Sequence, residues 1–199
     1  PPPPPPPPPP APPSHPAHAS TQGPPTPPAP PPPPLSCAEA PRAALREAPA
    51  VILVGEMRDI ETIRLALTAA ETGHLVLGTM HTRNAVGTIN RLIGSFPPEE
   101  QAQIRTMVSE SLRGIVSQRL AQKSDGTGQV AALEVLIATN AVSNLVRESK
   151  TFQIPSILQS GASLGMCLMD ASLNQLLKSG QIDRDEALRL CENPKSFGG

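Results

Sequence analysis

The stretch APAVILVGEMRD, residues 48–59, decides how the fold of this chain is interpreted. Its apolar run from Val51 to Val54 is short, is β-branched at both ends and follows a proline two residues earlier. This pattern favours a strand buried on both faces of a parallel sheet over a helix, which needs a longer apolar period. Glu56 then follows the carboxyl end of a strand, which is where ligands bind in open α/β sheets. The alternative is that Glu56 and Asp59 only cap the next helix.

The residues after this strand predict a helix. Asp59 suits the N-cap, Glu61 lies in the first turn, and apolar residues recur at helical spacing as far as Thr72. Gly73 then closes the helix.

A second strand is predicted at residues 74–81, HLVLGTMH, whose middle is apolar and whose ends are polar. Strand, helix and strand within about 30 residues indicate a βαβ unit, so the two strands run parallel with their carboxyl ends together. We therefore expect Glu56 and His81 to meet at one edge of the sheet. His74 is expected at the opposite end of its strand, so the two histidines should not bind one metal ion.

The rest of the chain predicts two helices, a hairpin and a helical C-terminal region. The turn SDGTG, residues 124–128, has the composition of a hairpin loop, and Pro98 with Glu99 suits the start of a helix. The expected elements are helices at 85–93 and from residue 97, strands at 115–122 and 129–137, and helices at 141–148 (capped by Asn140), 151–160, 170–178 and 183–191.

The first 34 residues are a different kind of polymer. They contain 22 prolines and no Asp, Glu, Lys or Arg, so they cannot build a core and are expected to be disordered with polyproline II character. A ligand for aromatic-lined grooves is the functional alternative. Because the chain begins with proline rather than methionine, we expect that its true start is absent or that this segment is not the natural partner of the rest. The predicted organisation is a disordered segment at 1–38, an α/β unit at 39–139 and a helical region at 140–199.

Composition argues against several classes of function. A formal net charge of −1 and a pI near 6.5 give no electrostatic basis for binding nucleic acid, and the absence of Trp and Tyr removes stacking platforms. Three cysteines without paired spacing argue against disulfides and a zinc site. No apolar run approaches the roughly 20 residues of a membrane span. We expect a cytoplasmic protein that does not insert into a membrane.

Several segments resemble one protein family, in the same order along the chain. LREAPAVILVGEMRD (45–59) resembles the signature of the type II/type IV secretion ATPases, in which the strand and its glutamate form a Walker B element, and TGHLVLGTMHT (72–82) resembles their histidine box. SESLRGIVSQRL (109–120), AVSNLVRE (141–148) and SLGM (163–166) are similar to the pilus retraction, twitching-motility or PilT-type branch. The SDGTG turn stands where extension and type II secretion ATPases carry a paired CxxC motif, which favours the retraction branch.

The resemblance implies the C-terminal half of a RecA-like P-loop NTPase core at 39–139, without its P-loop strand, followed by a C-terminal helical region. It also implies a hexameric motor that hydrolyses ATP with Mg²⁺ to retract a type IV pilus. The implied partners are copies of the chain or a full-length paralogue, and a pilus platform protein of the inner membrane. The implied location is the cytoplasmic side of that membrane, at the base of the pilus.

The resemblance also assigns roles to individual residues. Glu56 corresponds to the carboxylate that orients the attacking water, and His81 to a residue that contacts phosphate or relays the nucleotide state. Arg58 and Arg64 are further candidates for reaching phosphate or a neighbouring subunit, with a solvated salt bridge as the alternative. The supporting candidates are Arg58, His74 and Thr82.

The chain departs from the family pattern at functionally important places. The 199 residues contain no GxxxxGK[ST], so no cofactor-binding residue and no metal ligand is assigned. Ala48 and Ala50 stand where acidic residues are usual, and Ser143 stands where arginine is common. We therefore expect the C-terminal half of a retraction ATPase joined to an unrelated segment by truncation or frame shift, not active by itself. The alternatives are a non-catalytic assembly module, or a fragment of a type II secretion or pilus extension ATPase.

Overall fold

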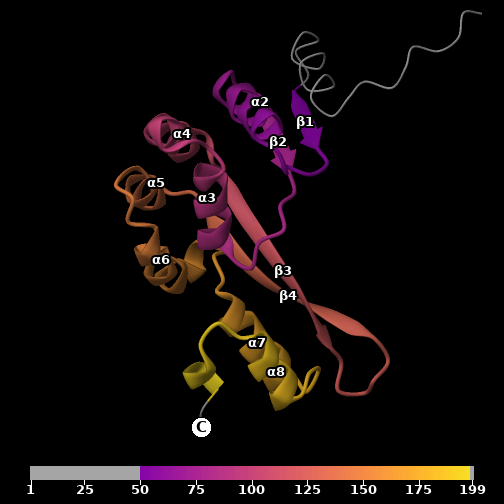
Figure 1. Cartoon of the computed structure of the whole chain (residues 1–199). Coiled ribbons are helices and arrows are strands. Elements are labelled where there is room, and N and C mark those ends of the chain that lie inside the picture. Colours follow the sequence, from indigo (N-terminus) through magenta and orange to yellow (C-terminus); the bar gives the residue numbers. More distant parts are fainter. Residues whose placement is uncertain (1–49, 198–199) are drawn as a thin grey trace, which may run out of the picture. The chain divides into compact units, whose positions relative to one another are not determined.

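The computed structural model describes residues 50–197 (Figure 1). The disorder expected at residues 1–38 lies outside the described residues. Along the chain the elements are β1 (Val51–Val54), α2 (Ile60–Glu71), β2 (Leu75–Gly78), α3 (Ala85–Gly94), α4 (Pro98–Ser111), β3 (Gly114–Gln122), β4 (Gln129–Ile137), α5 (Asn140–Arg147), η1 (Thr151–Gln153), α6 (Ile154–Ser160), η2 (Ala162–Leu164), α7 (Met169–Lys178), α8 (Arg184–Leu190) and η3 (Pro194–Phe197), where η marks a 3-10 helix. None of the helices between residues 50 and 197 is long and apolar enough to cross a membrane.

The predicted βαβ unit is present. β1 and β2 pair in parallel along their whole length, and α2 connects them (Figure 1). Asp59 begins α2 because its carboxylate accepts hydrogen bonds from the backbone N–H and from the hydroxyl of Thr62, each at 2.8 Å. Gly73 follows the helix with a φ of 96°, a left-handed conformation that glycine adopts without strain.

The expectation that both faces of this sheet are buried is wrong for the described residues. Ile52 and Val54 point toward α2 and form a small apolar cluster with it. The alternate residues point the other way, and the side chains of Leu53 and Leu77 are 76% and 49% exposed. α2 covers one face only, so the opposite face of the strands presents an apolar surface.

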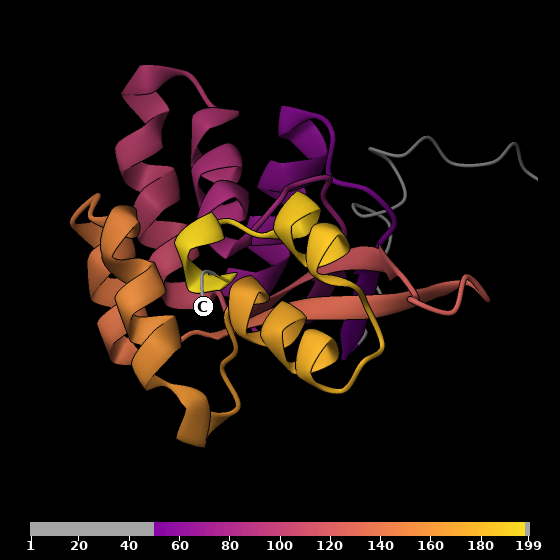
Figure 2. The same ribbon diagram turned by 90° about the horizontal axis from the view of Figure 1, so that it is seen from below.

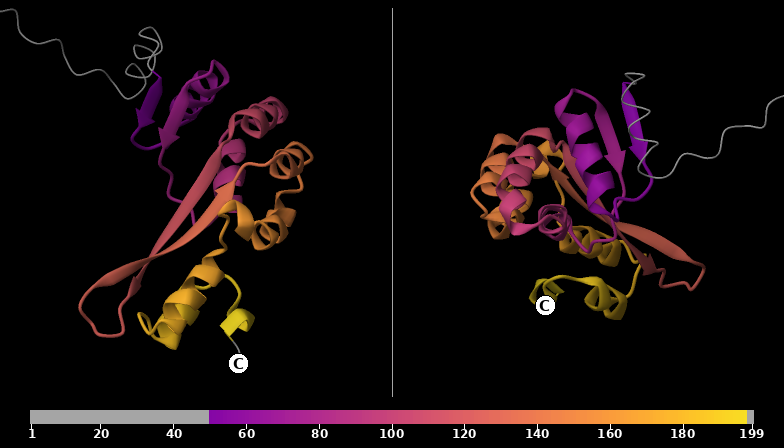
Figure 3. Two further views of the ribbon diagram at one scale, coloured as in Figure 1. Left: turned by 180° about the vertical axis from the view of Figure 1, so that it is seen from behind. Right: turned by 45° about the horizontal axis from the view of Figure 1, so that its top comes forward.

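β3 and β4 form the hairpin predicted around residues 124–128. They pair antiparallel from Gly114 with Ile137 to Gln122 with Gln129. α3, α4, α5 and α6 gather beside one end of the hairpin, whereas α7 packs on β4 and α8 on β3 farther along it (Figures 1 and 2). The view from behind in Figure 3 shows the same hairpin, whose loop residue Ser124 donates hydrogen bonds to the connection between α7 and α8, at 3.0 Å to the backbone oxygen of Gln181 and at 2.7 Å to that of Gly180.

Two apolar clusters stabilise this arrangement. The larger one combines residues of α2 to α6 with both hairpin strands, and it buries Ile104 and Val108 of α4. The smaller one joins α7 and α8 to the hairpin through fully buried residues such as Met169 and Leu173. The larger cluster includes residues on both sides of residue 139. The division of the chain into an α/β unit and a helical region at residue 139 stays a prediction.

The structure corrects three predicted element boundaries. β2 ends at Gly78, so the strand predicted to reach His81 is shorter and the histidine lies in the following loop. Thr139 caps α5 through a hydrogen bond from the N–H of Val142, whereas Asn140 is already helical. The helix predicted at 151–160 begins with the 3-10 turn η1 before α6.

Candidate functional site

Glu56 and His81 lie together beyond the carboxyl ends of β1 and β2, as the sequence predicted. Glu56 Oε1 is 3.1 Å from His81 Nε2. The backbone N–H of Met57 donates to the carbonyl oxygen of Thr79 at 3.0 Å, which keeps the two strand ends together past the last strand pair. Because Asp59 caps α2 and Glu56 does not, the capping alternative fails for Glu56.

A close contact between Met57 and Gly78 positions the chain beside Glu56. A Cβ atom on Gly78 would lie 2.8 Å from the Cε of Met57, which is closer than real Cβ atoms come. Glycine at this position therefore allows the Met57 side chain to lie over the end of β2. A side chain at this position would require the flexible end of the Met57 side chain to move.

Arg58 keeps the Glu56 carboxylate ionised. Arg58 Nε lies 2.5 Å from the oxygen of Glu56 that also faces His81. This hydrogen bond is the main cause that lowers the pKa of Glu56; desolvation opposes it, and the charges of Arg58, His81 and Arg91 add to it. Glu56 in turn raises the pKa of Arg58. The side chains of Arg58 and His81 are 73% and 81% exposed, so solvent and a ligand have access to the pair.

Arg91 of α3 belongs to the same site, although the sequence did not identify it. Its Nη1 donates to the backbone oxygen of His81 at 3.1 Å. This bond connects α3 to the loop of residues 79–84, here called the histidine loop. No local pattern marks this residue, because a basic side chain in the last turn of a helix is also the ordinary partner of the helix dipole.

The other sequence candidates have contacts with residues other than Glu56. The His74 ring, at the opposite end of β2, contacts the backbone oxygen of Ala69 at 3.1 Å. The Thr82 hydroxyl is paired with the hydroxyl of Thr88 at 2.6 Å. Arg64 forms a salt bridge to Glu100 at 2.6 Å and lies over the ring of Phe96, 5.0 Å from its centroid. These contacts agree with the salt-bridge alternative for Arg64, which here joins α2 to α4.

A cavity of about 430 Å³ lies between the histidine loop and β3. Met57, His81 and Thr82 contribute to its wall, and Ser117 lines it from the hairpin. Among the residues that the structure describes, the buried hydroxyl of Ser117 has no hydrogen-bond partner. The sequence did not predict this residue; a serine that alternates with apolar residues in a strand was the available signal.

The groups at this edge fit a phosphate better than a metal ion. Arg58 and Arg91 offer N–H donors and positive charge, and His81 offers a ring nitrogen; these groups suit phosphate oxygens. Within residues 50–197 there is no group of three or more His, Cys, Asp or Glu side chains placed to hold a metal. Glu56 alone therefore does not make a Mg²⁺ site with the described residues.

The fold and the site define an α/β protein with an acidic residue and a histidine at the carboxyl edge of two parallel strands. Residues 33–177 match the family described as "Type II/IV secretion system protein". The chain belongs to this family.

Similar proteins agree with the retraction branch, which confirms the predicted resemblance. The chain is 53% identical over 163 residues to the "Type IV pilus retractation ATPase PilT" of Pseudomonas aeruginosa, covering 82% of this chain and 47% of that protein. It is 54% identical over 163 residues to a "Twitching motility protein" of Neisseria gonorrhoeae, covering 82% of this chain and 44% of that protein.

A solved structure is similar as well. The "Crystal Structure of the Pilus Retraction Motor PilT and Bound ADP" matches with a TM-score of 0.73 and 48% identity, covering 80% of this chain and 45% of the solved one. The chain thus spans a little under half the length of these relatives.

Proposed function

We propose that this chain is the C-terminal half of an ATP-hydrolysing motor for type IV pilus retraction and twitching motility. One observation carries the proposal. Glu56 and His81 follow the carboxyl ends of two paired parallel strands, and Glu56 Oε1 lies 3.1 Å from His81 Nε2 on the edge where α/β proteins bind their ligands. The identity to retraction ATPases over 82% of the chain supports it.

Glu56 is the proposed water-orienting carboxylate. Arg58 lowers its pKa, so the carboxylate is ionised at neutral pH and accepts a hydrogen bond from water. Among the described residues both ionic contacts of this carboxylate fall on Oε1, so Oε2 is the oxygen that faces the water in this proposal. His81 and Arg91 are proposed to stabilise negative charge on phosphate.

ATP would supply the γ-phosphate whose bond to the rest of the nucleotide is hydrolysed. The described residues that would contact this phosphate are Arg58, His81 and Arg91. The bound ADP in the solved relative supports a nucleotide site in the family. Because the 199 residues contain no GxxxxGK[ST], we propose that the phosphate-binding loop and the Mg²⁺ ligands belong to a part of the RecA-like core outside these residues. The assembly that we propose is a hexamer, formed with copies of the chain or a paralogue. It would act on the platform protein at the cytoplasmic base of the pilus.

A non-catalytic assembly module is the second candidate function. It is favoured by the missing phosphate-binding motif within the 199 residues and by the exposed apolar face of β1 and β2, where the side chain of Leu53 is 76% exposed. A titration of the purified chain with Mg-ATP tests this second candidate. The module predicts no binding in the micromolar range, and micromolar binding would contradict it.

Reconstitution tests the catalytic proposal. The chain would be combined with the separately expressed part of the Pseudomonas aeruginosa relative that lies outside the matched region. We expect the mixture to hydrolyse ATP and Glu56→Gln to reduce the rate at least about 100-fold without abolishing nucleotide binding. Glu71→Gln, an exposed substitution at the end of α2, is the matched control and should keep the wild-type rate. Undiminished hydrolysis by Glu56→Gln would refute the role of Glu56.

A further inference from the structure

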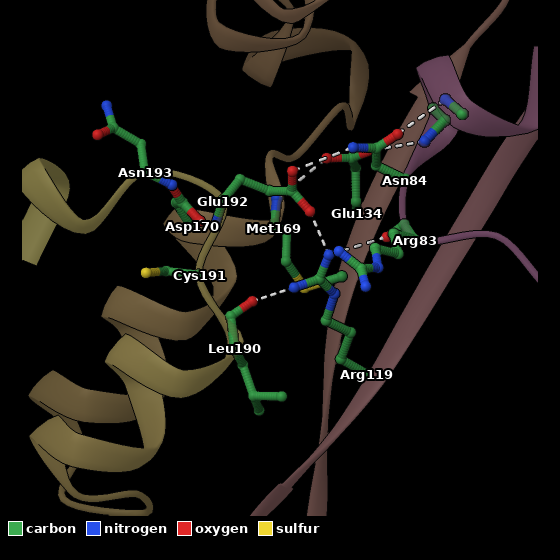
Figure 4. A network of polar contacts seen from close by, with 12 residues as sticks. Arg83, Asn84, Arg119, Glu134, Met169, Asp170, Leu190, Cys191, Glu192 and Asn193 are labelled. Carbon is green, nitrogen blue, oxygen red and sulfur yellow. Dashed lines mark hydrogen bonds and ion pairs between the residues drawn. The ribbon is translucent and has the colours of Figure 1, made fainter. Parts of the chain in front are cut away.

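Arg119 of β3 connects three separate segments of the chain. Its side chain is only 17% exposed. The guanidinium donates to the backbone oxygen of Leu190 at the end of α8, to the backbone oxygen of Arg83 at 3.3 Å, and to the Glu192 carboxylate (Figure 4). Arg83 belongs to the loop of residues 79–84, which carries His81. One planar group thus holds the histidine loop and the chain after α8 on the same strand.

Glu192 completes the connection from the other side. Its second carboxylate oxygen accepts a hydrogen bond from Asn84 Nδ2 at 3.1 Å, and Asn84 in turn caps α3 by accepting from the N–H of Gly87 at 2.8 Å. The backbone N–H groups of Glu192 and Asn193 donate to the Asp170 carboxylate of α7 at 2.7 and 2.9 Å (Figure 4). Glu192 therefore joins the start of α3 to the first turn of α7.

A second connection runs in parallel through Glu134 of β4. This carboxylate is 4% exposed. It accepts from the N–H of Ala85 at 2.8 Å and from the N–H of Met169 at 3.4 Å, which are the first residues of α3 and α7. Arg91, less than two turns farther along α3, donates to the backbone oxygen of His81. The histidine loop, α3, α7 and the end of α8 are thus held by direct polar contacts.

We propose that Arg119 and Glu192 are positioning residues that fix the histidine loop to the C-terminal helices, so that a displacement of His81 is transmitted to α7 and α8. The coupling of this motion to phosphate rests on the function proposed for Glu56 and His81. The physical basis is that the Arg119 side chain is only 17% exposed, so the charge-assisted hydrogen bonds of its guanidinium are costly to leave unmade. A shift of the loop therefore favours a joint shift of the chain after α8 over rupture of the contacts.

The test follows hydrogen exchange of individual amides by NMR in the full 199-residue chain. Two backbone amides are followed. The N–H of Gly87, which donates to Asn84, reports on the start of α3, and the N–H of Glu192, which donates to Asp170, reports on the chain after α8. Arg119→Met and Glu192→Gln are each expected to accelerate exchange of both amides at least tenfold. They are also expected to shift the imidazole signal of His81 and to leave that of His74 unchanged.

Two further variants separate positioning from general stabilisation. Asp170→Ala removes a contact on the C-terminal side only, and transmission predicts faster exchange at Gly87 as well. Glu186→Gln is the matched control, because Glu186 also links α8 to β3, through the N–H of Gln122 at 2.6 Å, without contacting the histidine loop. It should leave Gly87 exchange and the His81 signal at their wild-type values. Arg119→Lys, which keeps the charge and loses the planar fork, should give intermediate rates.

The outcomes decide the proposal independently of catalysis. If Arg119→Met and Glu192→Gln accelerate exchange at Glu192 alone, or if His81 and His74 shift together, the positioning role is refuted. If Arg119→Met accelerates exchange throughout the chain, that variant has lost general stability, and the result for Glu192→Gln decides between the two explanations. Glu192→Gln is the milder substitution because the Glu192 side chain is 39% exposed. Nucleotide enters none of these measurements, so a failed reconstitution would count against Glu56 and not against this network.

Discussion

Replacing Glu134 by alanine should destabilise the protein more than most single substitutions. The side chain is 4% exposed, and its two oxygens accept from the N–H groups of Ala85 and Met169. Both of these residues are fully buried, at 0% exposure, so water cannot replace the lost acceptor without local opening. Glu134→Ala leaves the first N–H groups of α3 and α7 unpaired at the same time.

The magnitude follows from these two donors. An unpaired buried donor costs about 1–3 kcal/mol, and the contact to Met169 is long at 3.4 Å, so its contribution belongs at the low end. Removing a buried carboxylate also relieves part of its desolvation cost. We expect Glu134→Ala to lower the free energy of unfolding by about 2–4 kcal/mol. Glu134→Gln keeps one acceptor oxygen and should lose about half as much.

Urea denaturation of the full chain measures this loss. The signal would be far-ultraviolet circular dichroism, because the chain contains no Trp or Tyr for fluorescence. The control is Glu148→Gln, which breaks an exposed surface pair with Lys150 and should leave the urea midpoint unchanged. If Glu134→Ala is as mild as this control, the carboxylate does not hold the two helix ends. Equal effects of the alanine and glutamine variants would show that the acceptor oxygen kept by glutamine contributes no stability.

Three further outcomes are expected. Asp59→Ala should lower the free energy of unfolding by about 1 kcal/mol in the same urea assay, since it removes the cap of α2; an unchanged midpoint would contradict this. The fold lowers the pKa of Glu56. The ion pair of Glu56 therefore stabilises the protein at pH values above the ordinary pKa of a glutamate, and this stabilisation is lost as the pH falls through the lowered pKa. Arg58→Met should raise that pKa, as followed by the carboxyl ¹³C shift, and a constant shift profile would disprove the assigned cause. Leu53→Glu, on the exposed face of β1, should reduce aggregation in light scattering without loss of stability, whereas equal aggregation would show that this face is not responsible.

Local sequence patterns predicted the elements that build the site. The apolar run at Val51, the cap at Asp59 and the glycine at residue 73 act on their immediate neighbours, and each element formed where its pattern placed it. The parallel pairing of the two strands then followed from the length of the connection, which brought Glu56 to His81.

These patterns did not predict which face of the sheet is exposed. A run such as VILV is equally apolar whether one or both faces are covered, and coverage depends on which other segments pack against it. α2 covers Ile52 and Val54, and Leu53 stays exposed. The physical reason is that periodicity identifies the apolar faces of an element and does not identify what lies against them.

Other contacts join residues that are far apart along the chain, and only the tertiary structure decided them. Arg119 and Glu192 are 73 residues apart, and Glu134 and Ala85 are 49 apart, so no local pattern relates them. A single charged residue in each apolar hairpin strand was visible in the sequence, but its partners were not. The sequence by itself determined the order of the strands, the cap of α2 and the meeting of Glu56 with His81, because short-range hydrogen bonds and apolar periodicity act between neighbours. The folded chain determined the exposed face and the network around Arg119, because their partners come together only when distant segments pack.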